Sequence, residues 1–318
     1  MALEFVNCGV CGGTASCPYA TGKDFEYRTS SDSFTMVKCL ACTNVYLNPR
    51  PTKDELNTIY PPNYYAYNYE SMISPIALKA KDFLDARKIA GWLKYLATAT
   101  PTFLDVGCGN GRYLKMLHKL GVPSEKLYGV ELSQREIDQV CAEGFNGLCG
   151  RIEDVVERLP QAGFDLIVIL QVLEHVEDPA LVVSHLAKLL RCGGVLIIET
   201  PNVEGLDAQI FKKRYWGGYH FPRHWNLFNK ATLTRLVTTQ GLKVRACNFL
   251  PAHSFWIFSC HHAIEEQFKL ALLARVFDPH KNVFLLSLFT GFDMLRAALG
   301  FSTSNIQFVA VKEVAVKE

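Results

Sequence analysis

The most regular pattern in the chain begins near residue 102, where short apolar runs alternate with segments whose apolar residues recur every three or four positions. The runs predict buried strands, and the longer period predicts amphipathic helices. The expected strands are 102–106, 127–131, 148–149, 166–170, 195–200, 243–250 and 307–311, and the expected helices are 112–120, 134–143, 152–158, 179–190 and 230–240. This alternation predicts an α/β fold, a doubly wound seven-stranded and mostly parallel sheet.

One interval interrupts the alternation, because about 55 residues separate the last two strands. Residues 253–300 are therefore expected to form a helical insertion, with helices over 255–264, 265–277 and 283–299. Their broad apolar faces have two possible interpretations. One is extra core or a dimer interface, and the other is a hydrophobic substrate pocket or a membrane-surface patch. Polar residues within 246–264 argue against a transmembrane helix.

Composition divides the rest of the chain into two further regions. Residues 1–48 carry two cysteine pairs and little helical periodicity, and residues 49–73 form a connector rich in Pro and Tyr with one short helix over 53–60. A helix over 75–97 then opens the main domain, 74–318. The expected domains are thus a small lobe, a connector or lid, and a catalytic domain with its insertion.

Charge and cysteine content narrow the functional class. The 318 residues are 49% hydrophobic and carry a net charge of +2. This near-neutral charge does not indicate a basic surface, so a nucleic-acid partner is not favoured. The first ten residues lack a signal-peptide pattern, and the eleven cysteines lack the density of a secreted disulfide scaffold. We expect a cytoplasmic protein, with membrane association through the apolar insertion as a second prediction.

The segment FLDVGCGNG, residues 103–111, joins the first strand to a helix. Gly107, Gly109 and Gly111 allow a sharp turn and close approach of a ligand at the carboxyl end of a parallel strand. A dinucleotide fingerprint that begins at Gly107 requires glycine at position 112, where the chain has Arg112. The loop, with Asp105 before it, predicts a different nucleotide-like ligand.

Acidic residues after the next strands extend this site. Glu131 ends the second strand, beside Leu132, and a carboxylate there can accept hydrogen bonds from both ribose hydroxyls. The alternative is a solvated carboxylate. After the third strand, Ile152 and Glu153 are expected to face an adenine, with a simple helix cap as the alternative for Glu153.

Four segments in order, FLDVGCGNG, YGVELS, FDLIVILQVLEHVEDP and GGVLIIETPN, resemble the motifs of class I S-adenosylmethionine-dependent methyltransferases over residues 80 to 250. The resemblance implies S-adenosylmethionine as cofactor, with the glycine loop on its methionine part and Glu131 on its ribose. It also places Gln171 at the donor, and it places Gln171, Leu173, Glu174 and His175 on the substrate side. In the resembled enzymes the connector folds over the donor, which implies a contact from Tyr64 or Tyr65; the alternative is surface or interdomain packing of these tyrosines.

Cysteines at positions 8, 11, 39 and 42 form two Cys-x-x-Cys pairs. Four thiolates at this spacing suit a closed, structural zinc site; the alternative is four unrelated buried cysteines. A lobe of this kind before the donor fold is similar to bacterial methyltransferases that act on sugars, lipid-linked glycans and secondary metabolites. The sugar C-methyltransferases carry a further C-terminal domain that residues 1–318 are not expected to contain, so we do not carry their substrate over.

Histidines are the expected general bases, because their reference pKa of about 6.5 lies near neutrality. His175 follows the fourth strand, while His220 and His224 lie in the loop 215–228 after the fifth. The alternatives are an ordering role for His175 and backbone-bonded histidines in the loop. Its aromatic residues suggest a substrate wall, and Arg223 either clamps an anion or pairs with an acid.

Together these features predict methyl transfer to a small-molecule, glycan or lipid-type acceptor by in-line displacement. The alternative is a zinc-bearing base methyltransferase of the ribosomal RNA type, and a third reading is an inactive binding module. The near-neutral charge opposes the second reading, and the intact glycine loop opposes the third. The sequence sets neither the acceptor atom nor the oligomeric state.

Overall fold

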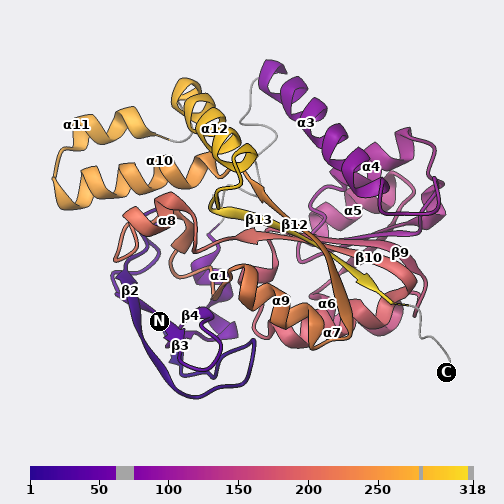
Figure 1. The fold of residues 1–318 in the computed structure, drawn as a ribbon, viewed down its shortest axis with the longest axis horizontal. Coiled ribbons are helices and arrows are strands. Elements are labelled where there is room, and N and C mark those ends of the chain that lie inside the picture. Colours follow the sequence, from indigo (N-terminus) through magenta and orange to yellow (C-terminus); the bar gives the residue numbers. More distant parts are fainter. Residues whose placement is uncertain (62–74, 279–281, 314–318) are drawn as a thin grey trace.

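A central sheet of seven strands organises the computed structural model, which describes residues 1–61, 75–278 and 282–313 (Figure 1). In spatial order the strands are β12 (Leu242–Leu250), β13 (Asn305–Lys312), β10 (Leu190–Pro201), β9 (Phe164–Leu170), β6 (Phe103–Val106), β7 (Leu127–Glu131) and β8 (Asn146–Cys149). β13 runs antiparallel to both neighbours, and the pairs from β10 to β8 are parallel. The predicted doubly wound, mostly parallel sheet is confirmed.

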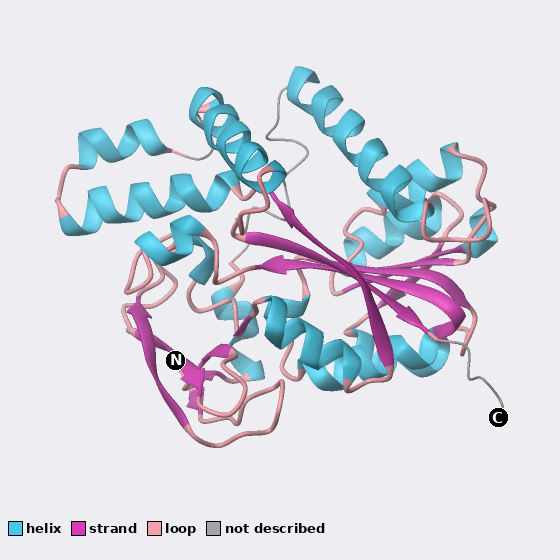
Figure 2. Ribbon diagram, viewed as in Figure 1, coloured by secondary structure: helices cyan, strands magenta, loops and turns pink. Residues whose placement is uncertain are grey.

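Helices cover both faces of this sheet, because successive side chains of a buried strand point to opposite faces (Figure 2). Phe103 packs in a cluster with one helical layer, and Leu104 packs in a second cluster with the other. The first layer holds α3 (Pro75–Leu93), α4 (Arg112–Lys119) and α5 (Gln134–Ala142), and the second holds α6 (Ile152–Val155), α7 (Pro179–Leu189) and α9 (Lys230–Thr238). The predicted helix 152–158 is divided, since a 3-10 turn, Val156–Arg158, follows α6.

The chain reverses its direction of travel across the sheet between β6 and β9. From β6 the strands proceed through β7 to β8, and β9 then returns to the other side of β6. Ligands bind outside the carboxyl ends of the strands at such a switch point. The loop after β6 and the 3-10 turn Leu173–His175 after β9 both begin there.

The N-terminal lobe is built with help from a distant segment. β2 (Ser16–Gly22), β3 (Phe34–Cys39) and β4 (Val45–Leu47) form a sheet that β11 (Asn226–Leu227) completes, and β1 (Leu3–Glu4) pairs with β5 (Arg50–Pro51). Residues of loop 215–228 fill the core of this lobe, where Trp216, Tyr219 and Phe221 join Phe34 and Met36 in one buried cluster. The lobe therefore shares its core with the main domain.

This packing bears on one expectation. The aromatic side chains of loop 215–228 were expected to form a substrate wall, but Trp216, Tyr219, Phe221, Trp225 and Phe228 are all buried. The lobe is too small to build a core of its own, so these rings supply its apolar interior. Most of these rings therefore serve tertiary packing, and Trp216, Tyr219 and Phe221 also line the small pocket at His220.

The connector is described up to residue 61, with a 3-10 turn, Lys53–Glu55, and a short helix, α1 (Leu56–Ile59). Further short elements are the 3-10 turns Ser124–Lys126 and Gly217–Tyr219 and the helix α8 (Leu206–Ile210). Tyr64 and Tyr65 lie outside the described residues, so their predicted contact with the donor stays a prediction.

The helical insertion projects beside β12 and β13 (Figure 1). It contains α10 (His253–His262), a π-helical turn (Ala263–Gln267), α11 (Ala271–Ala274), a 3-10 turn (Arg275–Phe277) and α12 (Val283–Ala298). The continuous helix predicted over 265–277 is wrong, because the chain turns there between α10 and α11. Trp256 stacks on Phe289 and donates its Nε1–H to buried Asp293 at 3.1 Å.

Much apolar surface of the insertion stays exposed, including Leu272, Phe284 and Leu299. Within the described residues, no helix combines the length and hydrophobicity that crossing a bilayer requires.

Candidate active site

The loop after β6 turns through three glycines in the left-handed region. Gly107, Gly109 and Gly111 have φ angles of 80°, 51° and 77°. A Cβ at Gly107 would lie 2.3 Å from Cγ2 of Val172, so the loop and the segment after β9 touch only because this residue has no side chain. A Cβ at Gly109 would meet no atom within 4 Å, which leaves this part of the loop open toward a ligand.

Glu131 connects the ends of the first two strands. Its Oε2 accepts a hydrogen bond from the Gly109 N–H at 3.0 Å, and its Oε1 accepts one from the Leu132 N–H at 2.7 Å. Beneath them Asp105 is buried; burial and the charge of Glu131 raise the pKa of Asp105 to about 7, against the opposing charge of Lys88. The predicted carboxylates thus lie around the same loop.

The other predicted donor contacts lie at the rim of this region. Ile152 is buried at the start of α6, and Glu153 beside it is half-buried. The N-cap of α6 is Arg151, so neither Glu153 nor Asp154 caps the helix. Gln171 is exposed after β9 with a φ of 55° and donates its Nε2–H to Oδ1 of Asn305 at 3.0 Å.

Three histidines from two loops meet next to this site. The ring centroids of His175 and His224 lie 4.6 Å apart, and those of His220 and His224 lie 5.0 Å apart. Two contacts bring these loops together. β11 pairs with β4 of the lobe, and the backbone N–H of Trp225 donates to the backbone carbonyl of Glu174 at 2.8 Å. The structure therefore assembles all three predicted bases into one cluster.

Each histidine has a different environment. Nδ1 of His175 lies 3.1 Å from the carbonyl oxygen of Arg223 and 2.8 Å from the hydroxyl of Tyr60, and Nδ1 of His224 lies 2.8 Å from the carbonyl oxygen of Gly218. Burial lowers the pKa of His175 to about 3 and lowers that of His224 well below its ordinary value. Burial therefore favours the neutral form of both imidazoles.

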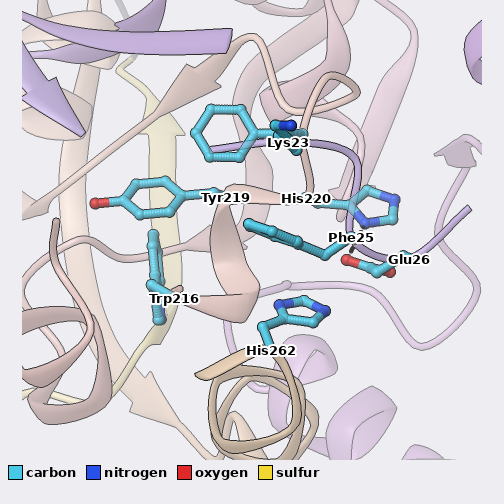
Figure 3. A pocket seen from close by; sticks show the side chains of 8 residues that line it. Lys23, Phe25, Glu26, Trp216, Tyr219, His220 and His262 are labelled. Carbon is cyan, nitrogen blue, oxygen red and sulfur yellow. Dashed lines mark hydrogen bonds and ion pairs between the residues drawn. The ribbon is translucent and has the colours of Figure 1, made fainter. Parts of the chain in front are cut away.

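His220 is paired with a carboxylate. Its Nδ1 lies 2.7 Å from Oε1 of Glu26 in the lobe, and Figure 3 shows the two side chains together in a small pocket. Burial would raise the pKa of Glu26, but His220, His262 and Arg223 lower it. A carboxylate partner orients an imidazole and stabilises its protonated form, which is the arrangement of a general base. The pocket is lined by Lys23, Phe25, Glu26, Trp216, Tyr219, His220, Phe221 and His262.

Arg223 has a structural role. Its guanidinium donates two hydrogen bonds to the carboxylate of Asp24, at 3.1 and 2.9 Å, and both side chains are fully buried. The same guanidinium lies 4.4 Å from the ring centroid of Tyr27. Of the two sequence-based alternatives, pairing with an acid describes Arg223, and the acid comes from the lobe.

Sequence reasoning missed the acidic partners of the histidine cluster. Asp24 and Glu26 lie about 200 positions from their partners, and no local signal links such distant residues. Glu174 belongs to the segment that the resemblance places on the substrate side, and the structure buries it completely. Its Oε2 accepts a hydrogen bond from Thr200 Oγ1 at 2.9 Å, and burial raises its pKa to about 8.

The four cysteines of the lobe also converge. The Sγ atoms of Cys8 and Cys42 lie 3.5 Å apart, those of Cys11 and Cys39 lie 3.6 Å apart, and all four lie within 4.8 Å of one another. Gly13 lies against this cluster, where a Cβ would approach two of the sulfur atoms to within 3.3 Å. The two Cys-x-x-Cys turns therefore form one tetrathiol cluster.

Comparison with known proteins agrees with this geometry. Residues 81–246, more than half of the chain, match the family described as methyltransferase domain. The chain belongs to this family. The matched residues include the glycine loop, Glu131 and the segment after β9, while the lobe and the whole insertion lie outside them.

Individual relatives of the methyltransferase domain differ in their named acceptors. A ubiquinone biosynthesis O-methyltransferase of Neisseria meningitidis is 30% identical over 106 residues, which are 31% of this chain and 43% of that protein. A tRNA U34 carboxymethyltransferase of Dichelobacter nodosus is 31% identical over 151 residues, 46% of each chain. The chain spans about half the length of the curated relatives it matches.

Among solved structures, a SAM dependent methyltransferase from Archaeoglobus fulgidus aligns with a TM-score of 0.47 and 19% identity, over 75% of this chain and all of that one.

Proposed function

We propose that this protein transfers the methyl group of S-adenosylmethionine to a hydroxyl of a small-molecule or lipid-type acceptor. The observation that carries the proposal is the open glycine loop at the switch point of the sheet, with Glu131 across it and a histidine cluster at the adjacent strand end. Donor and acceptor groups then lie at one edge of the sheet, which in-line displacement requires.

The reaction needs one base. The acceptor oxygen forms a bond to the methyl carbon, the carbon–sulfur bond breaks with its electron pair left on sulfur, and S-adenosylhomocysteine leaves. The hydroxyl proton passes to an imidazole. His220 suits this step best, because the Glu26 carboxylate stabilises the imidazolium that forms.

Two features support an apolar or amphipathic acceptor. The first is the name of several relatives, the ubiquinone biosynthesis O-methyltransferases, which gives oxygen as their acceptor atom and the biosynthesis of ubiquinone as their pathway. The insertion also exposes large apolar side chains on α12 and around α11, and amphipathic helices of this kind bind lipid surfaces or hydrophobic substrates. We extend the proposal to peripheral membrane contact through the insertion, which co-sedimentation of the full chain with lipid vesicles tests.

The tetrathiol cluster is proposed to hold structural zinc. Sulfur atoms at about 2.3 Å from a tetrahedral ion lie about 3.8 Å apart, and two of the Sγ–Sγ distances here are 3.5 and 3.6 Å. Four thiolates leave no open coordination position, so the ion would stabilise the lobe and take no part in methyl transfer.

Donor binding and methyl transfer are tested separately. Calorimetric titration with S-adenosylmethionine and S-adenosylhomocysteine is expected to show binding of both. Transfer of labelled methyl is then measured with lipid, glycan and RNA fractions, and lipid or small-molecule products are expected. A tRNA-modifying enzyme is among the relatives, so methylation of RNA alone would favour the base methyltransferase instead. Failure to bind either ligand would overturn the proposal.

A further inference from the structure

Glu174, His175 and His224 form a second cluster of metal-ligating side chains, separate from the cysteines. One ligand atom of each residue lies within 4.8 Å of the others. Glu174 and His175 belong to the 3-10 turn after β9, and His224 comes from the loop before β11. The fold therefore brings one carboxylate and two imidazoles to a single point beside the donor loop.

The hydrogen bonds of the two imidazoles determine which nitrogen can bind an ion. A carbonyl oxygen only accepts hydrogen bonds, so we assign the proton of His224 to Nδ1, which donates to Gly218. We likewise assign the proton of His175 to Nδ1, which donates to Arg223 and lies 2.8 Å from the Tyr60 hydroxyl, an acceptor in this tautomer. In a neutral imidazole the other nitrogen, Nε2, then carries the lone pair. Metal-binding histidines commonly have this arrangement, in which the second nitrogen donates to a backbone carbonyl and holds the ring in place.

Glu174 supplies the third observation. Its side chain is completely buried, and one carboxylate oxygen accepts the hydrogen bond from Thr200. The other oxygen, Oε1, has no hydrogen-bond partner among the described residues. A buried carboxylate oxygen without a partner is costly, and a cation shared with the two imidazoles would satisfy it.

From this geometry we propose that Glu174, His175 and His224 bind a divalent transition-metal ion. Two imidazole nitrogens and one carboxylate oxygen form a three-ligand set that leaves coordination positions open, and this set suits Mn²⁺, Fe²⁺, Co²⁺ or Zn²⁺. The absence of a thiolate distinguishes it from the cysteine cluster, which favours the softer Zn²⁺.

The role of the ion rests on the proposed function. An open position would take the acceptor hydroxyl, lower the pKa of that hydroxyl and hold its oxygen toward the methyl group, as metal ions do for bound water. His175 and His224 would then be ligands, and His220 with Glu26 would take the proton. Two histidines of the cluster would thus bind the ion, and the third would accept the proton.

Mn²⁺ alone is the probe that tests the site, because thiolates bind it poorly. The full chain is titrated with Mn²⁺ while the signal of the free ion is followed by electron paramagnetic resonance. We expect one bound ion per chain, and Glu174→Gln and His224→Gln should each weaken binding by at least about tenfold. His185→Gln, on α7 outside the cluster, and Cys17→Ser, at an exposed cysteine outside the tetrathiol cluster, are the matched controls and should bind Mn²⁺ as the wild type does.

Circular dichroism of each variant separates loss of the site from loss of the fold. If the folded His224→Gln variant binds Mn²⁺ like the wild type, or if the wild type binds none, the inference is wrong. The same samples are titrated with S-adenosylmethionine. Donor binding without Mn²⁺ binding overturns the metal site and leaves the proposed function in place. Mn²⁺ binding without donor binding overturns the proposed function and leaves the metal site in place.

Discussion

Replacing Asp24 with Asn tests the ion pair that connects the lobe to the histidine loop. Asp24 accepts two hydrogen bonds from Arg223, and neither side chain is exposed. Breaking a buried pair by removing one charge typically costs about 3–5 kcal/mol, because the remaining charge is left without compensation. The carbonyl of the same arginine holds His175, so the loss of the pair also acts on the histidine cluster.

The pKa of Asp24 provides a second measure of this interaction. Burial would raise that pKa, but the hydrogen bonds and charge of Arg223 outweigh burial and lower it from 3.8 to about 2. A difference of about two pKa units corresponds to about 2.5 kcal/mol at neutral pH. We therefore expect Asp24→Asn to lower the free energy of unfolding by about 2–4 kcal/mol at pH 7.

The pH dependence of this loss has a definite sign. Because the folded-state pKa of Asp24 lies below the unfolded value, its stabilisation is complete above pH 4 to 5 and disappears as the pH falls through about 2. About half of it should remain at pH 3. The difference between wild type and variant should shrink accordingly, since a protonated Asp24 resembles asparagine.

Urea unfolding at pH 7, 4 and 3, followed by circular dichroism, measures this difference. Asp32→Asn is the matched control, because Asp32 is an exposed acid of the same lobe, and its effect should stay within about 0.5 kcal/mol. A loss below about 1 kcal/mol for Asp24→Asn, or one of constant size from pH 7 to pH 3, would refute the reasoning.

Three further predictions concern the other clusters. Glu131→Ala should weaken S-adenosylmethionine binding by about tenfold or more in calorimetry, because it removes the carboxylate at Gly109; unchanged affinity contradicts the ribose assignment. In His220→Asn the new asparagine tolerates the left-handed backbone at φ 39°. The substitution should lower kcat by about a hundredfold or more and leave donor affinity unchanged; full turnover of the variant would exclude His220 as the base. Cys39→Ser should lose zinc by elemental analysis and lower Tm by several degrees, unlike exposed Cys17→Ser.

Much of the sheet and its cofactor edge can be predicted from local pattern. All seven expected strands form, and the helix expected over 179–190 begins at Pro179, where Asp178 supplies the N-cap. These signals depend on neighbouring residues, since strand period, glycine spacing and helix capping act over a few positions. The paired cysteines are similarly local, although their convergence is a tertiary event.

The helical insertion and the aromatic loop were harder to predict for a physical reason. An apolar run is compatible with a buried helix, an exposed face or the core of another lobe, and periodicity does not separate these outcomes. The rings of loop 215–228 are buried because a small lobe lies over them, and the helix expected over 265–277 is broken by a turn that its composition does not mark.

The sequence by itself determined the order of strands and helices, the glycine loop with its acidic neighbour, and the cysteine pairs, because each is written within a short stretch of chain. Only the tertiary structure decided which distant residues meet. It brought Asp24 to Arg223 across 199 positions, and it brought Glu174 to His224 although α7 and β10 lie between them in the chain. Side-chain partners at such separations depend on how the lobe packs on the sheet, and that packing assembles the histidine cluster.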